Sequence, residues 1–243
     1  MPVNDVFTAE NLERALLRTV SPKISHQSPK PPQPSLSGAS AKVILPPTLS
    51  SALPLSTTLH RRIAVRQFAR RPISLAHLST VLAASELQSA LPAAGDCSAA
   101  PSLYVHAWKV QKVTPAYYLY EPEAHSLAFR SRVPPSADIP AMFRQIEFAS
   151  SAAMLVIVGG LDDSLTRLGN HGYRLLLLAA GTALHRCWLA AVSVGLAGCV
   201  CEAPFQRANG HPLYPLPEGQ IPLLALALGE ASDGGPDDGG SEE

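Results

Sequence analysis

The stretch from Tyr173 to Val200 constrains the fold more than any other part of the sequence, because it is nearly apolar on every face. A helix that is hydrophobic all round is either buried in protein or spans a membrane. The stretch is long enough for a span, but Arg174, His185 and Arg186 lie within it, and charges at mid-span are costly in lipid. We therefore expect a buried helix at the centre of one compact domain, or one shared with a second subunit, and no membrane span.

Two glycines and two further apolar runs frame this helix. Gly195 and Gly198 are expected to end it, since glycine adopts left-handed or extended conformations at little cost. The runs Ala153–Gly159 and Ile221–Gly229 are continuous and apolar. Such runs are typical of central strands that are covered on both faces.

The composition argues against several classes of protein. The formal net charge of the 243 residues is zero, which disfavours nucleic-acid binding. The four cysteines, Cys97, Cys187, Cys199 and Cys201, are too few and too scattered for a disulfide scaffold. The Cys-x-Cys pair leaves zinc binding as an alternative, but buried thiols are favoured. No secretory signal opens the chain, so the cytoplasm is the expected compartment.

Three regions are expected along the chain. Residues 1–41 combine an amphipathic helix, residues 4–19, with an arm rich in Ser, Pro and Lys, which is too polar to bury a core. Residues 42–230 form the folded domain. Residues 231–243 are a disordered tail with five acidic residues and no basic one.

The pattern within the folded region predicts an α+β domain. Ser74 is expected to cap a helix from Leu75 to about Glu86, and residues 138–149 also have a helical period. Alternating or β-rich segments predict strands over residues 103–110, 117–120 and 126–129. Together with the apolar runs they indicate a central mixed or antiparallel sheet flanked by helices.

An arginine-rich stretch is the strongest candidate for a binding site. Five arginines fall between Arg61 and Arg71, interleaved with apolar residues. Helical i,i+4 spacing would direct Arg62 and Arg66 the same way, and two adjacent guanidinium groups suit a phosphate or another anion. A solvated charged surface is the alternative interpretation.

Hydrolytic and nucleotide-binding motifs are absent from the sequence, including G-x-S-x-G, the P-loop, G-x-G-x-x-G and H-E-x-x-H. The eight histidines are dispersed. His171, His185 and His211 are each candidates for catalysis, although a lone histidine is more often a local hydrogen-bonding group.

Five motifs follow one another between residues 42 and 230. They are V-I-L-P at residues 43–46, R-R-I-A-V-R-Q-F-A-R-R-P-I-S-L from Arg61, Y-L-Y-E-P-E-A-H-S-L from Tyr118, G-Y-R at residues 172–174 and G-L-A-G-C-V at residues 195–200. Their order and spacing resemble the nitroreductase-like flavoproteins. The closer resemblance is to the SagB/McbC-type dehydrogenases, the flavin subunits that oxidise azolines to azoles in ribosomally made peptides.

The resemblance implies a nitroreductase-like fold, FMN held at a homodimer interface, and hydride transfer to the flavin. It also implies a modified precursor peptide as substrate and a cyclodehydratase as partner. The positions that match the cofactor-binding segments of the family are Arg62, Ala64, Arg66, Ser98, Cys201, Glu202 and Ala203.

Several positions depart from the family pattern. Ile63 and Ala64 replace an arginine and a serine of the family, and Glu230 stands where many relatives carry a basic residue that suits a phosphate.

The catalytic base is the largest departure. The Lys-Tyr pair that the resemblance associates with catalysis is Arg167 and Leu168 here, and neither can accept a proton. Tyr173 and His171 are the remaining candidates to take the proton, besides solvent.

Two hypotheses follow. The first is an FMN-dependent dehydrogenase that oxidises thiazoline or oxazoline rings in a peptide. The second is a catalytically silent homologue that serves as a structural subunit of a peptide-modifying complex. Other flavin oxidoreductions, such as nitro or quinone reduction, are a further alternative.

Overall fold

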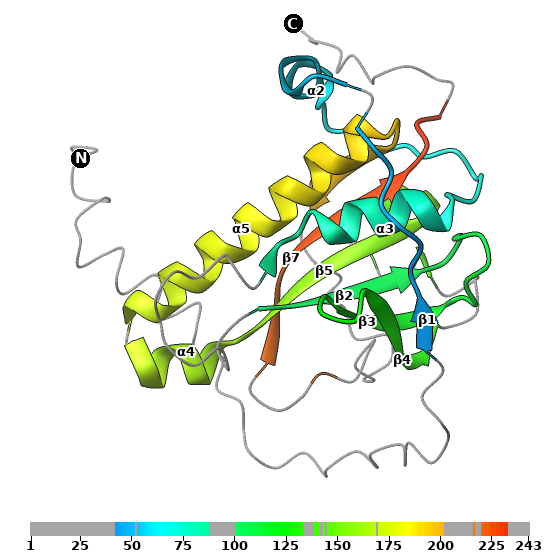
Figure 1. The fold of residues 1–243 in the computed structure, drawn as a ribbon. Helices are drawn as coiled ribbons and strands as arrows, with labels where there is room; N and C mark the ends of the chain where they lie inside the picture. Colours follow the sequence, from blue (N-terminus) through cyan, green and yellow to red (C-terminus); the bar gives the residue numbers. More distant parts are fainter. Residues whose placement is uncertain are drawn as a thin grey trace, which may run out of the picture. The chain divides into compact units, whose positions relative to one another are not determined.

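A seven-stranded sheet, with helices packed on one face, organises the chain (Figure 1). The computed structural model describes residues 42–51, 53–87, 101–133, 145–168, 170–201 and 220–232, together with residues 139, 140, 143 and 216. The strands are β1 (Lys42–Ile44), β2 (Ser102–Ala107), β3 (Ala116–Glu121), β4 (Ser126–Arg132), β5 (Ala153–Gly160), β6 (Ala197–Cys201) and β7 (Gln220–Gly229). The helices are α2 (Leu55–Arg61), α3 (Leu75–Ala83), α4 (Leu161–Leu168) and α5 (Asn170–Ser193), with a 3-10 helix at Ile146–Ser150.

The sheet has the order β1-β4-β3-β2-β5-β7-β6. Each pair of neighbouring strands is antiparallel, so the antiparallel form of the prediction is confirmed. β5 lies near the middle between β2 and β7, and its residues 153–159 are all buried. The two apolar runs of the sequence are therefore central strands, as predicted.

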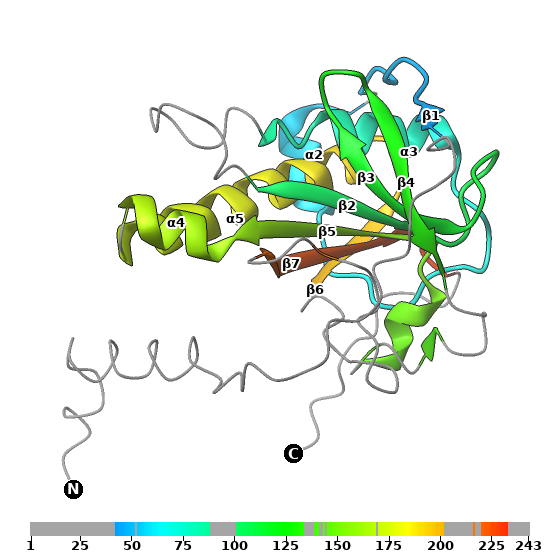
Figure 2. The same cartoon turned by 90° about the horizontal axis from the view of Figure 1, so that it is seen from below.

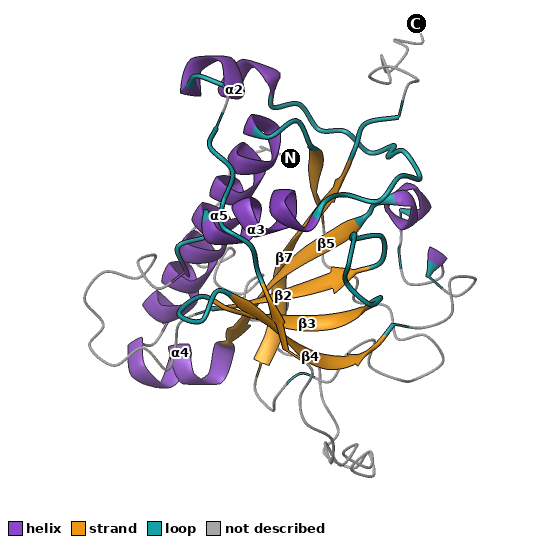
Figure 3. Ribbon diagram, turned by 45° about the vertical axis from the view of Figure 1, so that its right-hand side comes forward, coloured by secondary structure: helices purple, strands orange, loops and turns teal. Residues whose placement is uncertain are grey.

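Alternate residues of β5 enter two separate hydrophobic clusters, as the two-residue period of a strand requires. Leu155 and Ile157 face the cluster under α3 and α5. Met154 and Val156 face an aromatic-rich cluster on the other side of the sheet. Figures 2 and 3 show α3 and α5 gathered on one face of the strands.

The Ser74 cap is confirmed, because the Ser74 hydroxyl oxygen accepts a hydrogen bond from the His77 amide at 3.1 Å. The helix that follows ends at Ala83, slightly before the predicted end. The predicted strands of residues 103–110, 117–120 and 126–129 correspond to β2, β3 and β4.

Helix α5 is not buried on all sides within the single chain, so of the two expected arrangements complete burial inside one domain is wrong and sharing with a second subunit stays a prediction. Ala183 and Leu184 are fully buried in the cluster between α5, α3 and the sheet, but Leu177 and Leu178 on the outer side are 41% and 66% exposed. A sheet covers only one side of a helix that lies on it, and the described part of the chain supplies no second cover. The segment His171–Ser193 is long and apolar enough to cross a membrane, but half of an 18-residue apolar window within it is buried in the protein, as in the core helix of a globular domain.

Only one of the two glycines ends this helix. Gly195 has a φ of +84° and follows the last helical turn, as predicted. Gly198 lies inside β6, a strand that the sequence did not reveal. Because β6 is apolar like the helix before it, the sequence shows no change in composition where the helix ends and the strand begins.

Three further elements differ from the predictions. α2 lies just before the arginine-rich segment, where no helix was predicted, and α4 precedes α5 as a separate helix. The helix predicted over residues 138–149 is wrong for the described residues 145–149, since Ile146–Ser150 form a 3-10 helix. The predicted N-terminal helix and arm and the acidic tail from residue 233 lie outside the described residues.

The buried histidine of β2 provides a test of the aromatic cluster. His106 is fully buried, and its ring lies 4.5 Å from the Tyr117 ring and 5.9 Å from the Trp108 ring between centroids. Burial lowers the pKa of His106 from 6.5 to about 3. Between these pH values the unfolded chain binds a proton that the folded chain does not. The free energy of unfolding therefore keeps its full contribution from neutral His106 above pH 6.5, and this contribution falls as the pH is lowered toward 3.

We expect His106→Phe to flatten this acid dependence between pH 6.5 and 4.5, where the wild-type protein loses about 1 kcal/mol per pH unit. Urea unfolding at several pH values measures it. His60→Gln is the control, because His60 is exposed. Equal pH slopes for the wild type and His106→Phe would contradict the prediction.

Candidate functional site

The arginine-rich segment is extended and lies along the edge strand β6. Helix α2 ends at Arg61, and Arg62 already has extended φ and ψ angles of −71° and 92°. The Val65 amide donates a hydrogen bond to the Gly198 carbonyl at 3.1 Å, and Ala64 forms a parallel bridge with Gly198. The i,i+4 helical spacing predicted for Arg62 and Arg66 is therefore wrong.

Arg62 stacks on an aromatic ring of α5. Its guanidinium carbon lies 4.4 Å from the centre of the Trp188 ring, a cation–π contact that contributes about 0.5–2 kcal/mol. A side chain at Gly198 would meet the same ring at 3.1 Å, so glycine lets the indole approach the strand. The indole Nε1 of Trp188 is buried and has no hydrogen-bond partner among the described residues.

Arg66 approaches the opposite face of β6. Cys199 follows Gly198 and belongs to the aromatic-rich cluster. Burial raises the pKa of the Cys199 thiol, while the charge of Arg66 and its hydrogen bond to the thiol partly offset that rise. Successive residues of a strand face opposite sides, so the two guanidinium groups lie on different sides of the sheet edge.

Cys201 lies on the same face of β6 as Cys199 and is also buried. Cys187 lies on the buried face of α5, where burial raises the pKa of its thiol to about 12. No disulfide joins these three described thiols, which confirms the prediction of buried thiols. Within the part of the chain that the structure describes, no three His, Cys, Asp or Glu side chains are grouped to bind a metal.

The arginine segment also pairs with the chain beyond β7. The Ala69 amide donates to the Glu230 carbonyl at 2.9 Å, and Phe68 packs on Gly229. The Glu230 carboxylate lies 3.8 Å from the Arg71 guanidinium. Its negative charge, which we expected to repel a phosphate, is therefore partly offset by a neighbouring cation.

His171 and Tyr173 are not brought to the arginine segment within one chain. Both lie in the first turn of α5, whereas Trp188 lies in its last turns. At 1.5 Å per residue, Tyr173 and Trp188 are about 22 Å apart along the helix axis. Three of the predicted cofactor positions lie outside the described residues: Ser98, Glu202 and Ala203. The described ones lie in the arginine segment and in β6: Arg62, Ala64, Arg66 and Cys201.

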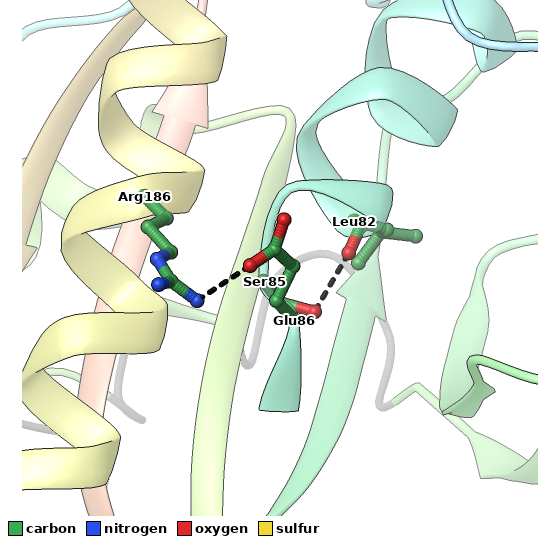
Figure 4. Close-up of polar contacts among 4 residues, drawn as sticks. All are labelled: Leu82, Ser85, Glu86 and Arg186. Atoms are coloured by element: carbon green, nitrogen blue, oxygen red, sulfur yellow. Dashed lines mark hydrogen bonds and ion pairs between the residues drawn. The ribbon is translucent and has the colours of Figure 1, made fainter. Parts of the chain in front are cut away.

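Sequence reasoning missed Trp188 and the role of Gly198. The sequence does place Trp188 shortly before the Gly195–Cys201 segment, and this spacing could have indicated a contact between them. However, a single aromatic residue does not stand out in an apolar stretch of this length. Arg186, which we treated as a charge inside an apolar helix, reaches from α5 toward the chain that follows α3. It donates to the Glu86 carboxylate at 2.8 Å beyond the end of α3 (Figure 4).

The motif from Tyr118 has a structural explanation. His125 lies in the turn between β3 and β4; its Nδ1 is 3.1 Å from the Tyr120 hydroxyl and its Nε2 is 2.7 Å from the Ser79 hydroxyl. Ser79 donates to the Pro46 carbonyl. This network ties the hairpin to α3 and to the chain after β1, beside a pocket of about 320 Å³ lined in part by Pro47, Glu86 and Tyr120.

The comparisons agree with the fold. The profile of the Nitroreductase family matches residues 59–230, and the chain belongs to that family. No curated protein matches the sequence significantly.

Three solved structures show the similarity. A nitroreductase-like protein from Anabaena variabilis superposes with a TM-score of 0.65 at 18% identity, over 79% of this chain and 42% of that one. This chain thus spans less than half of the Anabaena protein. The microcin synthetase McbBCD complex of E. coli, with a truncated pro-peptide bound, contains a chain with a TM-score of 0.54 at 14% identity, over 96% of this chain and 85% of that one. A nitroreductase-like protein from Desulfovibrio desulfuricans, in complex with FMN, superposes with a TM-score of 0.50 at 15% identity. The match covers 79% of this chain and 92% of that one.

Two glycine substitutions test the contact between β6 and α5. Gly198→Ala would place a methyl group 3.1–3.2 Å from Trp188 and Leu226, and overpacking of this kind costs about 1–3 kcal/mol. Gly181→Ala in α5 would meet nothing within 4 Å and should be neutral or stabilising by up to about 1 kcal/mol. Urea unfolding measures both. Equal stabilities of the two variants would show that the Trp188 ring yields freely.

Proposed function

We propose that the protein is an FMN-dependent dehydrogenase that oxidises thiazoline or oxazoline rings of a ribosomally made peptide to azoles. The observation that carries the proposal is the extended arginine segment against β6 in a Nitroreductase family fold. The peptide substrate is supported by the similarity to a chain of the McbBCD complex, which covers 96% of this chain. A modified precursor peptide and a cyclodehydratase are the proposed partners, and the cytoplasm is the proposed compartment.

The residues at β6 fit an anionic, planar cofactor. Arg62 and Arg66 place positive charge on the two sides of the strand, which suits a ligand with a phosphate at one end and carbonyl oxygens at the other. The buried Trp188 Nε1 is a donor that lacks an acceptor in the described chain, and an unsatisfied buried donor is costly. We infer that FMN is held here by Arg62, Arg66 and the backbone at Ala64, with Cys201, Glu202, Ala203 and Ser98 as further candidates. FMN, when bound, accepts a hydride from the ring that is oxidised.

A homodimer is part of this proposal. Leu177 and Leu178 expose apolar surface along α5, and Leu55, Leu59 and Ile63 do so around the neighbouring α2. A second copy would cover this surface. Because Tyr173 and His171 lie at the far end of α5 from Trp188, we propose that they take part in proton removal at the partner's flavin rather than at their own.

The second candidate function is a catalytically silent structural subunit. Arg167 and Leu168 stand in α4 at the positions of the Lys-Tyr pair, and neither accepts a proton. A subunit of this kind would contribute the fold and the peptide-binding surface to a complex without turning over substrate.

We expect the purified protein to be yellow and to release FMN on heat denaturation. Arg66→Ala should weaken FMN binding about tenfold to a hundredfold, because it removes a charge-assisted hydrogen bond. Flavin fluorescence titration of the apoprotein measures this. Arg132→Ala is the control, since Arg132 is an exposed arginine at the end of β4. A colourless protein that binds no added FMN would exclude the dehydrogenase, and an unchanged affinity of Arg66→Ala would exclude the role of Arg66.

The two candidate functions differ in turnover. A dehydrogenase should bleach its flavin absorbance in the absence of air when an azoline-containing peptide is added, and the peptide should lose two hydrogen atoms by mass. Tyr173→Phe should lower this rate with little effect on FMN affinity. Bound FMN that no azoline peptide reduces would favour the structural subunit.

A further inference from the structure

The acidic and basic residues of this sequence are segregated, although they balance in number. No acidic residue lies between Glu13 and Glu86, and this interval includes all five arginines of the arginine-rich segment. The last eleven residues, 233–243, carry five acidic side chains and no basic one. Segregation of this kind favours attraction between the two segments when the fold brings them together.

The fold brings the arginine segment to residues 231 and 232, the last described residues before the acidic tail. The Ser232 amide donates to the Gln67 carbonyl at 3.2 Å, and Ala231 forms an antiparallel bridge with Phe68. The Ala69 amide donates in turn to the Glu230 carbonyl. The tail therefore starts from a backbone position that Arg66 and Arg70 flank in sequence.

Basic side chains outnumber acidic ones at this exit, where Glu230 lies beside Arg71 and the charge of Glu147 acts on Cys199. Arg66, Arg70 and Arg71 are exposed, and neither Arg66 nor Arg70 forms an ion pair with a carboxylate of the described residues. Arg70 lies close enough to Lys109 for its charge to help lower the pKa of that amine, after burial as the larger cause. Like charges held close together repel each other, and a nearby anion relieves that repulsion.

We propose that the acidic tail, residues 233–243, is the intramolecular partner of this basic surface and competes there with the anionic ligand of the arginine segment. The competition rests on the proposed function, since the ligand is the phosphate of FMN. Because the tail is covalently joined to Ser232, its carboxylates meet the arginine segment at an effective concentration on the order of millimolar. Each exposed ion pair is weak, so the tail tunes the affinity for the ligand without blocking the site.

Docking of the tail is tested first, without FMN, on the full-length protein. In ¹⁵N NMR spectra at low salt, the tail amides of the wild type should differ in shift from their positions in about 1 M salt, where the Debye length falls to about 3 Å. The charge reversal Arg70→Glu should move the tail signals to the high-salt positions even at low salt. Arg132→Glu is the matched control and should leave them unchanged. Tail signals that coincide in all three proteins at both salt concentrations would overturn the proposal.

Competition is tested next, with a full-length variant whose tail charges are removed by Asp→Asn at residues 233, 237 and 238 and Glu→Gln at residues 242 and 243. We expect this variant to bind FMN about fivefold more tightly than the wild type at low salt, with the difference lost in about 1 M salt. If the tail docks but the variant and the wild type bind FMN with equal affinity, the competition is overturned and the docking stands. If neither protein binds FMN, the proposed function and the competition both fail, while the NMR result still decides whether the tail docks.

Discussion

The structure depends on the burial of β5 and its neighbour β7 on both faces. Met154, Leu155, Val156 and Ile157 have no exposed surface, and each buried side chain of this size contributes about 1.5–3 kcal/mol. Such a strand needs cover on two sides. α3 and α5 provide it on one face, and the aromatic cluster of Tyr104, Trp108, Tyr117 and Phe148 provides it on the other.

The candidate site is a consequence of this arrangement. β7 carries β6 as the edge strand, and an edge strand has unpaired backbone groups that must be satisfied or covered. The arginine segment meets this need by hydrogen bonding to Gly198 and then to the chain after β7. The positive charge is thus fixed at the sheet edge by backbone pairing, while the side chains remain available to a ligand.

The two faces of β6 also explain why Arg62 and Arg66, only four residues apart, contact different side chains. Gly198 faces the Trp188 ring on the α5 side, and Cys199 faces the aromatic cluster. Arg62 lies on the Trp188 side of the strand, and Arg66 lies on the Cys199 side. A ligand that met both guanidinium groups would have to extend past the strand edge, which suits a long molecule with separate anionic and polar ends better than a free phosphate.

The central strands, the Ser74 cap, the stop at Gly195 and the location of the basic segment can be predicted from the amino-acid sequence, because each depends on local composition or backbone preference. The path of that segment depends instead on contacts between distant parts of the chain. Its spacing suits a helix, but pairing with Gly198 holds it extended, and long-range hydrogen bonds of this kind leave no local signal. The same holds for α5: its apolar residues predicted burial, but how much of it is covered depends on how far the sheet reaches, which leaves Leu177 and Leu178 exposed.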